Sequence, residues 1–115
     1  MNFKKVKIEI FIPAEYTNKL REELNNIGAL GVGNYDNVIS ITKIKGYWRP
    51  LVGANPFDGK INEISEANED KIEFSTDIKN IENIIKVIKE VHPYEEPVIN
   101  IIPLLNDKFD INLNH

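Results

Sequence analysis

Two segments with strand periodicity each lead into a segment with helix periodicity, and together the two pairs account for about half of the chain. From Val6 to Ile12, every second residue is valine or isoleucine, which is the period of a half-buried strand. Pro13 ends this strand, and apolar residues then recur every three or four positions up to Gly28, as on one face of a helix. These residues are Tyr16, Leu20, Leu24 and Ile27. Gly28 is placed to end the helix as a left-handed cap.

The second pair begins with residues 60–75, where the alternation has an interruption. We interpret the interruption as a bulge, or as a turn at 68–70 that makes the segment a small hairpin. Thr76 or Asp77 is placed to cap the helix that follows. That helix ends at His92, because the next residue is a proline. Its apolar stripe consists of Ile78, Ile81, Ile84, Ile85, Ile88 and Val91.

Two further strands complete the order. A glycine-rich connection at 28–34 precedes a β-rich segment at 35–45, and residues 98–102 form a last strand. The order strand, helix, strand, strand, helix, strand predicts a ferredoxin-like α+β fold, with one antiparallel sheet and both helices on one face. We expect this domain to span residues 1–105 and residues 106–115 to form a loose tail.

Composition excludes several classes of protein. The 115 residues suffice for one domain, and 42% hydrophobic with 28% charged residues is ordinary for a globular chain. A net charge of −4 with only two arginines argues against nucleic-acid binding. No apolar run reaches the ~20 residues of a membrane span. The start of the chain does not resemble a secretory leader and cysteine is absent, so we expect a cytoplasmic location.

Three segments are candidates for chemistry. The first, 28–33, has three glycines, but it follows a helix and precedes a strand, the reverse of a phosphate-binding loop. We interpret it as a cap and turn. The second, 46–59, contains Tyr47, Trp48 and Arg49, residue types enriched at interaction surfaces. This segment either packs onto its own domain or forms an interface with another molecule.

The third candidate is 92–97, where a histidine is followed by two glutamates. A helix stop is the simpler interpretation. The alternative is a divalent metal site for copper or zinc made of His92, Glu95 and Glu96. Neighbouring strand residues point to opposite faces, which weakens this alternative. The sequence holds no cysteine and no nucleophile elbow around Ser40, Ser65 or Ser75, and the acidic run 63–77 is typical of a solvated face. We therefore expect a domain that is not an enzyme.

Three stretches in this order resemble the YqfO-type domain, which occurs inserted in proteins of the NGG-interacting-factor-like family and also as a stand-alone chain. They run from Gly31 to Asp36, from Arg49 to Gly59 and from His92 to Pro97. The resemblance implies a ferredoxin-like fold akin to the CutA and PII proteins, which assemble as trimers. It carries over no metal ligand, because the family's dinuclear site lies in flanking halves. Val38 stands where the family usually has cysteine.

The chain direction places the 46–59 and 92–97 connections at one end of the sheet and the 28–34 connection at the other. We predict a ligand or interface rim of Tyr47, Trp48, Arg49, His92, Tyr94 and Glu95. The leading hypothesis is a non-catalytic, self-assembling domain that binds a small ligand or a partner protein. One alternative is a CutA-like divalent-metal protein. The other is an accessory domain that covers the active site of a separate metallohydrolase.

The second and third strands along the chain, at 35–45 and 60–75, are longer than the first and last strands. Their hairpin is therefore expected to overhang the helix layer and to leave an edge with unpaired backbone groups. Pairing between identical copies would give the backbone groups of this edge hydrogen-bond partners. Copies related by a closed rotation would form a finite assembly and not a filament. The chain alone predicts association, and the family resemblance favours a homotrimer over a dimer.

Overall fold

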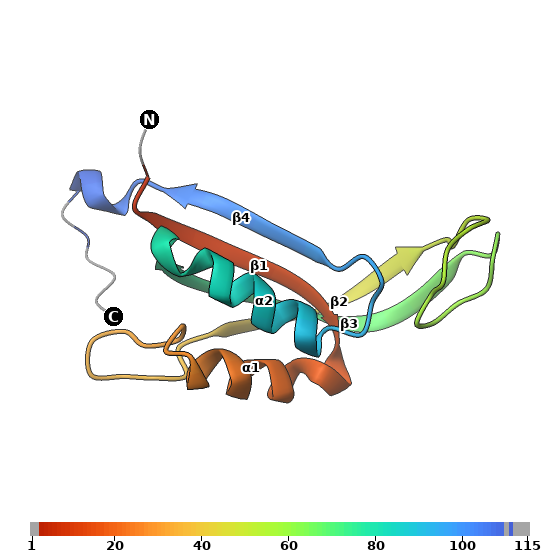
Figure 1. Ribbon diagram of the computed structural model, residues 1–115, viewed down its shortest axis with the longest axis horizontal. Helices are drawn as coiled ribbons and strands as arrows, with labels where there is room; N and C mark the ends of the chain where they lie inside the picture. Colours follow the sequence, from red (N-terminus) through yellow and green to blue (C-terminus); the bar gives the residue numbers. More distant parts are fainter. Residues whose placement is uncertain (1–2, 110, 112–115) are drawn as a thin grey trace.

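A computed structural model describes residues 3–109 and 111. It contains four strands, two α-helices and three short 3₁₀ turns (Figure 1). The strands are β1 (Lys5–Pro13), β2 (Ser40–Trp48), β3 (Ser65–Asp77) and β4 (Val98–Leu104). The helices are α1 (Thr17–Asn26) and α2 (Ile81–Val91). The 3₁₀ turns are Ala14–Tyr16, Ile78–Asn80 and Asn106–Phe109.

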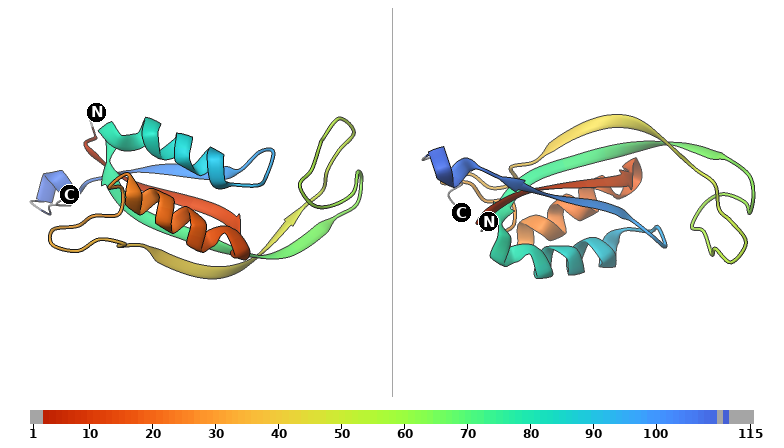
Figure 2. Two further views of the ribbon diagram at one scale, coloured as in Figure 1. Left: turned by 60° about the horizontal axis from the view of Figure 1, so that its bottom comes forward. Right: turned by 90° about the horizontal axis from the view of Figure 1, so that it is seen from above.

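The sheet has the order β2-β3-β1-β4, and every neighbouring pair is antiparallel. Both helices cover one face of it, as the view from above in Figure 2 shows. This is the ferredoxin-like α+β fold that the order of elements predicted. None of the helices among residues 3–109 and 111 is long and apolar enough to cross a membrane.

The core lies between the helices and the sheet. The alternating residues of β1 point into it, and Ile8, Ile10 and Ile12 are fully buried. The helices contribute Leu20, Leu24, Ile84 and Ile88, which recur at the predicted helical spacing. Because burial of each such side chain stabilises the fold by roughly 1.5–3 kcal/mol, this periodicity decides which face of each element turns inward.

The first helix ends at the predicted glycine. Gly28 has φ of +79°, and its N–H donates to the Asn25 carbonyl at 3.0 Å, while the Ala29 N–H donates to the Leu24 carbonyl at 3.0 Å. This pair of bonds is a Schellman cap. The prediction that Ile27 and Ile78 belong to the buried apolar stripes of the helices is wrong, since Ile27 is 45% exposed and Ile78 is 48% exposed. Ile27 follows the last residue of α1, and Ile78 lies in a 3₁₀ turn whose period differs from that of α2.

Strands β2 and β3 differ from their predicted bounds. Strand β2 starts at Ser40 and not at Tyr35, because Val32 and Tyr35 exchange backbone hydrogen bonds in a tight turn of their own. It then continues through Gly46, Tyr47 and Trp48, which the sequence placed in a loop.

The predicted bulge or turn within 60–75 is also wrong. Strand β3 is continuous, and its register with β1 is constant from Asp77 opposite Lys5 to Glu69 opposite Pro13. Ile61 and Ile64, which broke the alternation, precede the strand and belong to the 49–64 connection. Thr76 and Asp77 form no side-chain cap on the turn that follows, and Asp77 is paired with Lys5 instead.

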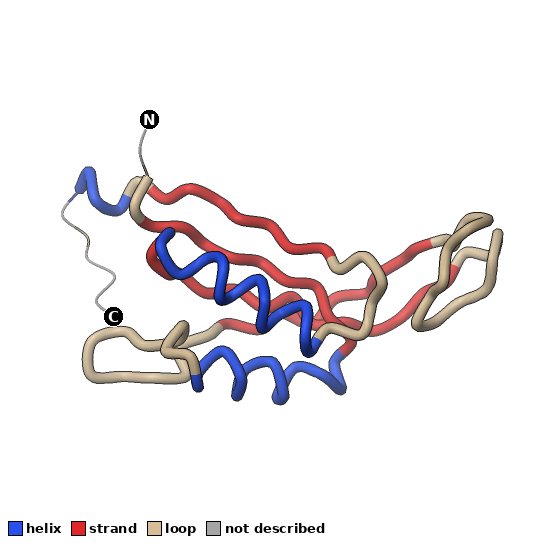
Figure 3. The backbone as a smooth tube through the Cα atoms, viewed as in Figure 1, coloured by secondary structure: helices blue, strands red, loops and turns tan. Residues whose placement is uncertain are grey.

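The β2–β3 hairpin extends beyond the rest of the sheet. Glu69 is the last residue of β3 opposite β1, yet residues 65–68 continue to pair with residues 45–48 of β2. Figure 3 shows this two-stranded ribbon reaching past both helices. The overhang that the sequence predicted is therefore present, with the 49–64 connection at its tip.

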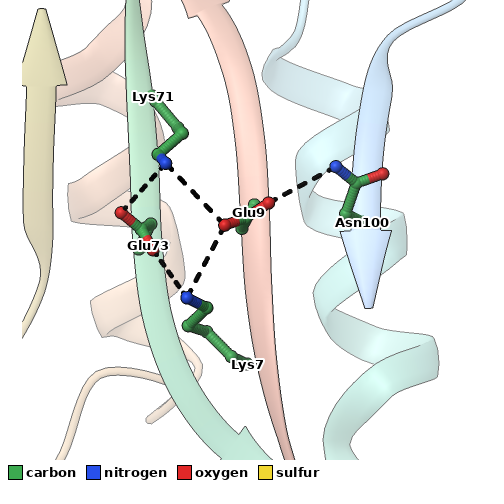
Figure 4. Close-up of polar contacts among 5 residues, drawn as sticks. All are labelled: Lys7, Glu9, Lys71, Glu73 and Asn100. Carbon is green, nitrogen blue, oxygen red and sulfur yellow. Dashed lines mark hydrogen bonds and ion pairs between the residues drawn. The ribbon is translucent and has the colours of Figure 1, made fainter. Parts of the chain in front are cut away.

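The face of the sheet away from the helices carries a network of charges (Figure 4). Lys7 lies 2.9 Å from Glu73 and 3.6 Å from Glu9. Lys71 lies 3.5 Å from Glu73 and 3.8 Å from Glu9, and Asn100 donates to Glu9. Hydrogen bonding to Lys7 lowers the pKa of Glu73 against the opposing effect of its partial burial. The two lysines and two glutamates balance one another across β1 and β3.

The predicted tail at 106–115 begins with a single 3₁₀ turn over Asn106–Phe109. Residues 110 and 112–115, on which half of that prediction falls, lie outside the described residues.

Candidate functional site

A pocket of about 840 Å³ lies at the end of the sheet from which the overhanging hairpin extends. The 49–58 part of the hairpin connection and the connection between α2 and β4 form its walls. Phe11 and Val98, from the ends of β1 and β4, add apolar surface. The glycine-rich connection at 28–34 lies at the opposite end of the molecule (Figure 1).

The structure brings the predicted rim residues together. Tyr47, Trp48, Arg49, Tyr94 and Glu95 all line this pocket. His92, the sixth predicted residue, does not line it and is buried behind Tyr94, with the two ring centroids 5.0 Å apart. The chain direction predicted that these residues share one rim at one end of the sheet, and a binding role for them stays a prediction.

Aromatic rings join the hairpin connection to the rest of the domain. The Tyr94 ring centroid lies 5.7 Å from that of Trp48 and 6.1 Å from that of Phe57. Phe57 is in turn 5.9 Å from Tyr16 in an edge-on contact. Such pairs stabilise by about 0.5–1.5 kcal/mol beyond the area they bury. The 46–59 segment thus packs onto its own domain, while Tyr47 stays 64% exposed toward solvent.

Two hydrogen bonds hold the pocket walls in place. The Trp48 indole N–H donates to the Asp58 carbonyl at 3.2 Å, which closes the hairpin connection on itself. The Asn55 backbone N–H donates to Glu95 Oε1 at 3.1 Å, which ties that connection to the 92–97 segment. The two walls are therefore linked directly, although they are 40 residues apart in sequence.

Glu69 lies in the pocket wall and is only 6% exposed. Its Oε2 accepts a hydrogen bond from the Tyr94 hydroxyl at 2.6 Å. Its Oε1 lies against Gly46, in the space that the first atom of any side chain at that position would need. Burial and the hydrogen bond to Glu69 raise the pKa of the Tyr94 hydroxyl well above its usual value of 10. Tyr94 therefore keeps its proton and acts as a donor.

His92 has both ring nitrogens engaged. Nε2–H donates to the Phe11 carbonyl at 2.6 Å, and Nδ1 accepts the Tyr94 backbone N–H at 3.2 Å. This pattern requires the neutral ring with its proton on Nε2. Burial lowers the pKa of His92, although the Phe11 carbonyl and the Glu69 charge oppose that effect. His92 thus ends α2, as predicted, and joins it to β1.

The alternative metal set of His92, Glu95 and Glu96 is not assembled. A metal ligand needs a free nitrogen lone pair, and the acceptor nitrogen of His92 already binds the Tyr94 N–H. Glu95 is bound by the Asn55 N–H. Across residues 3–109 and 111, no group of three or more histidine, cysteine, aspartate or glutamate residues is placed to hold a metal ion.

The sequence interpretation missed Glu69 and Asp70, because it assigned the acidic run 63–77 to a solvated face. Both are buried. Asp70 accepts a hydrogen bond from the Thr17 hydroxyl at 2.5 Å and lies 2.8 Å from the Lys43 amine. One signal for Glu69 was available, since a glycine inside a strand, here Gly46, often marks a close approach by another group.

The comparisons with known proteins bear on the fold of the chain. No protein-family model matches the chain. A GTP cyclohydrolase 1 type 2 homolog of Staphylococcus epidermidis is 33% identical over 98 residues, which are 85% of this chain and 27% of that protein. The homolog of Halalkalibacterium halodurans is 34% identical over 101 residues, or 88% of this chain and 27% of the relative. The chain thus spans about a quarter of the length of these relatives.

Three solved structures share the fold. A Bacillus cereus protein related to NIF3 has a TM-score of 0.78 at 25% identity, over 90% of this chain and 26% of that one. CutA from Synechococcus elongatus has a TM-score of 0.66 at 15% identity, over 90% and 79% of the two chains. A PII protein of Arabidopsis thaliana has a TM-score of 0.60 at 16% identity, over 90% and 77%. The predicted resemblance is confirmed: over most of its length the chain is similar to the YqfO-type domain of the NIF3-related proteins, with the fold of CutA and PII.

Proposed function

We propose that this chain is a non-catalytic, self-assembling domain that binds a small ligand or a protein partner in the pocket between its two connections. The observation that carries the proposal is the pocket itself. Its volume of about 840 Å³ falls in the range of small-molecule sites, and aromatic side chains with a few charged groups line it. The lack of cysteine supports a cytoplasmic location as part of the same proposal.

Binding without catalysis is supported by the groups that line the pocket. Among the described lining residues there is no serine, threonine, cysteine, lysine or histidine. The Tyr94 hydroxyl is held protonated by burial and by Glu69, and His92 has no free nitrogen. A hydroxyl, thiol or amine nucleophile paired with a histidine base is therefore not assembled among the described lining residues.

Self-assembly is supported by the overhanging hairpin. Among the described strands, β2 pairs with β3 alone, so its outer edge presents free backbone groups. Ile41, on this strand, is 43% exposed. Lys43 and Lys45 place two charges along the edge, but each also lies beside a carboxylate of β3. The family resemblance favours three copies, related by a closed rotation.

Two measurements test the proposal. Light scattering at micromolar concentration should give three times the 13.2 kDa chain mass, whereas a mass near 13.2 kDa would refute self-assembly. Native mass spectrometry of protein purified gently from cell extract should show an added mass, which a Tyr94→Ala variant loses. A chain that carries no ligand and retains no partner from extract would contradict the binding role.

A second candidate follows from the length comparison. The curated relatives contain the matching segment within a protein of which it is about a quarter. The domain could therefore cover the active site of a separate metallohydrolase that supplies the remaining parts. Co-purification of such a protein with the tagged chain would support this role, and its absence from the captured proteins would leave the small-ligand role.

A further inference from the structure

We propose that the pocket binds a small organic cation, an ammonium or guanidinium group on an apolar body. This inference rests on the proposed binding function, because it names the ligand class of the same pocket. Three observations carry it: the charge of the lining, the burial of Glu69 and the arrangement of the aromatic rings.

The lining has an excess of negative charge. Asp58, Glu69, Glu95 and Glu96 contribute four carboxylates, against which Arg49 is the single cation. The ion pairs described within residues 3–109 and 111 involve none of these five residues. Among the described residues these five groups therefore have no ion-pair partner, and the net charge of the lining is negative, which favours a cation.

Glu69 is the buried carboxylate of the pocket lining. It is 6% exposed, and its Oε2 accepts the Tyr94 hydroxyl bond. Its Oε1 accepts no hydrogen bond from any described residue. The described hydrogen-bond partner of this buried carboxylate is the neutral Tyr94 hydroxyl, and a bound cation would give it a partner of opposite charge.

The aromatic rings supply the complementary surface for such a ligand. Trp48 and Phe57 flank Tyr94 with ring centroids 5.7 and 6.1 Å from its own, and Phe11 and Val98 add apolar contacts. A cation within about 6 Å of an aromatic face gains roughly 0.5–2 kcal/mol. Arg49 and three of the carboxylates are exposed, so the buried charge of the lining is that of Glu69. An anion of the same size would meet four carboxylates and a single cation.

Trp48 provides a direct readout, because it is the only tryptophan in the chain and it lines the pocket. The probes are benzylamine, benzyl alcohol and benzoate, which share one aromatic body and carry a positive, zero and negative charge at pH 7. Each is titrated at constant ionic strength while tryptophan fluorescence is recorded. We expect a saturable change with benzylamine at a lower concentration than with either of the other probes.

Matched variants test which charged residue is responsible for benzylamine binding. Glu69→Gln keeps the shape and an acceptor for Tyr94 but removes the charge, and should weaken benzylamine binding by about fivefold or more. Glu90→Gln, an equal change of charge on the exposed side of α2, should leave it unchanged. Arg49→Ala should leave benzylamine binding equal or tighter. Circular dichroism checks that each variant is folded.

Several outcomes would overturn the inference. Benzoate binding most tightly, with loss in Arg49→Ala, would assign the pocket to an anion. Equal binding of the three probes, no binding of any, or equal effects of the two glutamine variants would remove the charge selectivity. If native mass spectrometry meanwhile reveals a neutral or anionic ligand, the binding function stands and the cation inference alone is wrong.

Discussion

The carboxylate of Glu69 occupies the space that a side chain at residue 46 would need. A Cβ at this position would overlap Glu69 Oε1 and would lie 2.8 Å from the carboxyl carbon of Glu69. The two residues are diagonal neighbours on β2 and β3, since Gly46 pairs with Ala67 and Glu69 pairs with Ile44. The glycine therefore permits Glu69 to lie flat across the hairpin and to reach the Tyr94 hydroxyl.

Gly46→Ala should displace Glu69 and break its bond with Tyr94, lowering the free energy of unfolding by about 1–3 kcal/mol. The loss should be smaller when Glu69→Ala is already present, because the clash then has no partner. Urea denaturation of the two single variants and the double variant measures this coupling. Gly31→Ala is the control, because a Cβ there meets nothing closer than 3.8 Å. Strictly additive effects would contradict the steric account.

His92 should make stability depend on pH. Burial lowers its pKa from 6.5, so the unfolded chain takes up a proton before the folded protein does. Stability should therefore fall as the pH drops through about 6.5 and level off below the folded-state pKa. Urea denaturation from about pH 7.5 to 5 should show this slope, and His92→Ala should be less stable but flatter in the same window. His115, the other histidine, lies outside the described residues, and its replacement by alanine serves as the control.

Thr17→Val should destabilise the protein by about 1–3 kcal/mol, because it removes a hydrogen bond from a buried carboxylate. The Thr17 hydroxyl binds Asp70 Oδ2 and so connects the start of α1 to β3. Burial alone would raise the pKa of Asp70, but the bonds from Lys43 and Thr17 outweigh it and hold that pKa below its usual value. Thr42→Val, at an exposed position on β2, should change the free energy of unfolding by less than about 0.5 kcal/mol.

Ile41→Glu should weaken self-assembly. Ile41 is an exposed apolar residue on the free edge strand, and a charge there opposes pairing between identical edges. Light scattering across a concentration series should show the variant dissociating at higher concentration than the parent. Ile27→Glu, at the end of α1, makes the same change at an exposed isoleucine away from β2. Equal dissociation of both variants would argue against assembly through the β2 edge.

Copper and zinc should not bind at His92. Because both ring nitrogens are engaged, a metal would have to displace the Phe11 or the Tyr94 contact. Calorimetric titration should therefore show no binding tighter than about micromolar that depends on this residue. Tight binding to the parent that disappears in His92→Ala would restore the metal alternative.

Local patterns were sufficient for most of the fold and for the approximate place of the site. The isoleucine spacing of β1 and α2, the cap at Gly28 and the stop at His92 depend on neighbours within a few residues, so they can be recognised in the sequence. The chain direction then brings Trp48 and Tyr94 to one end. The strand bounds were harder, because Ser40 and Ser65 begin their strands only by pairing with partners distant in the chain.

The sequence by itself determined the order of elements, the side that each turns to the core and the two connections that carry the unusual residues. The tertiary structure decided the state of the individual polar groups. Whether Glu69 is solvated or buried depends on the register of β3 against β1 and β2, on the bare surface of Gly46 and on a tyrosine 25 residues away. Apolar burial follows a local period, whereas a hydrogen bond requires two particular atoms to meet, which only the assembled sheet and its connections arrange.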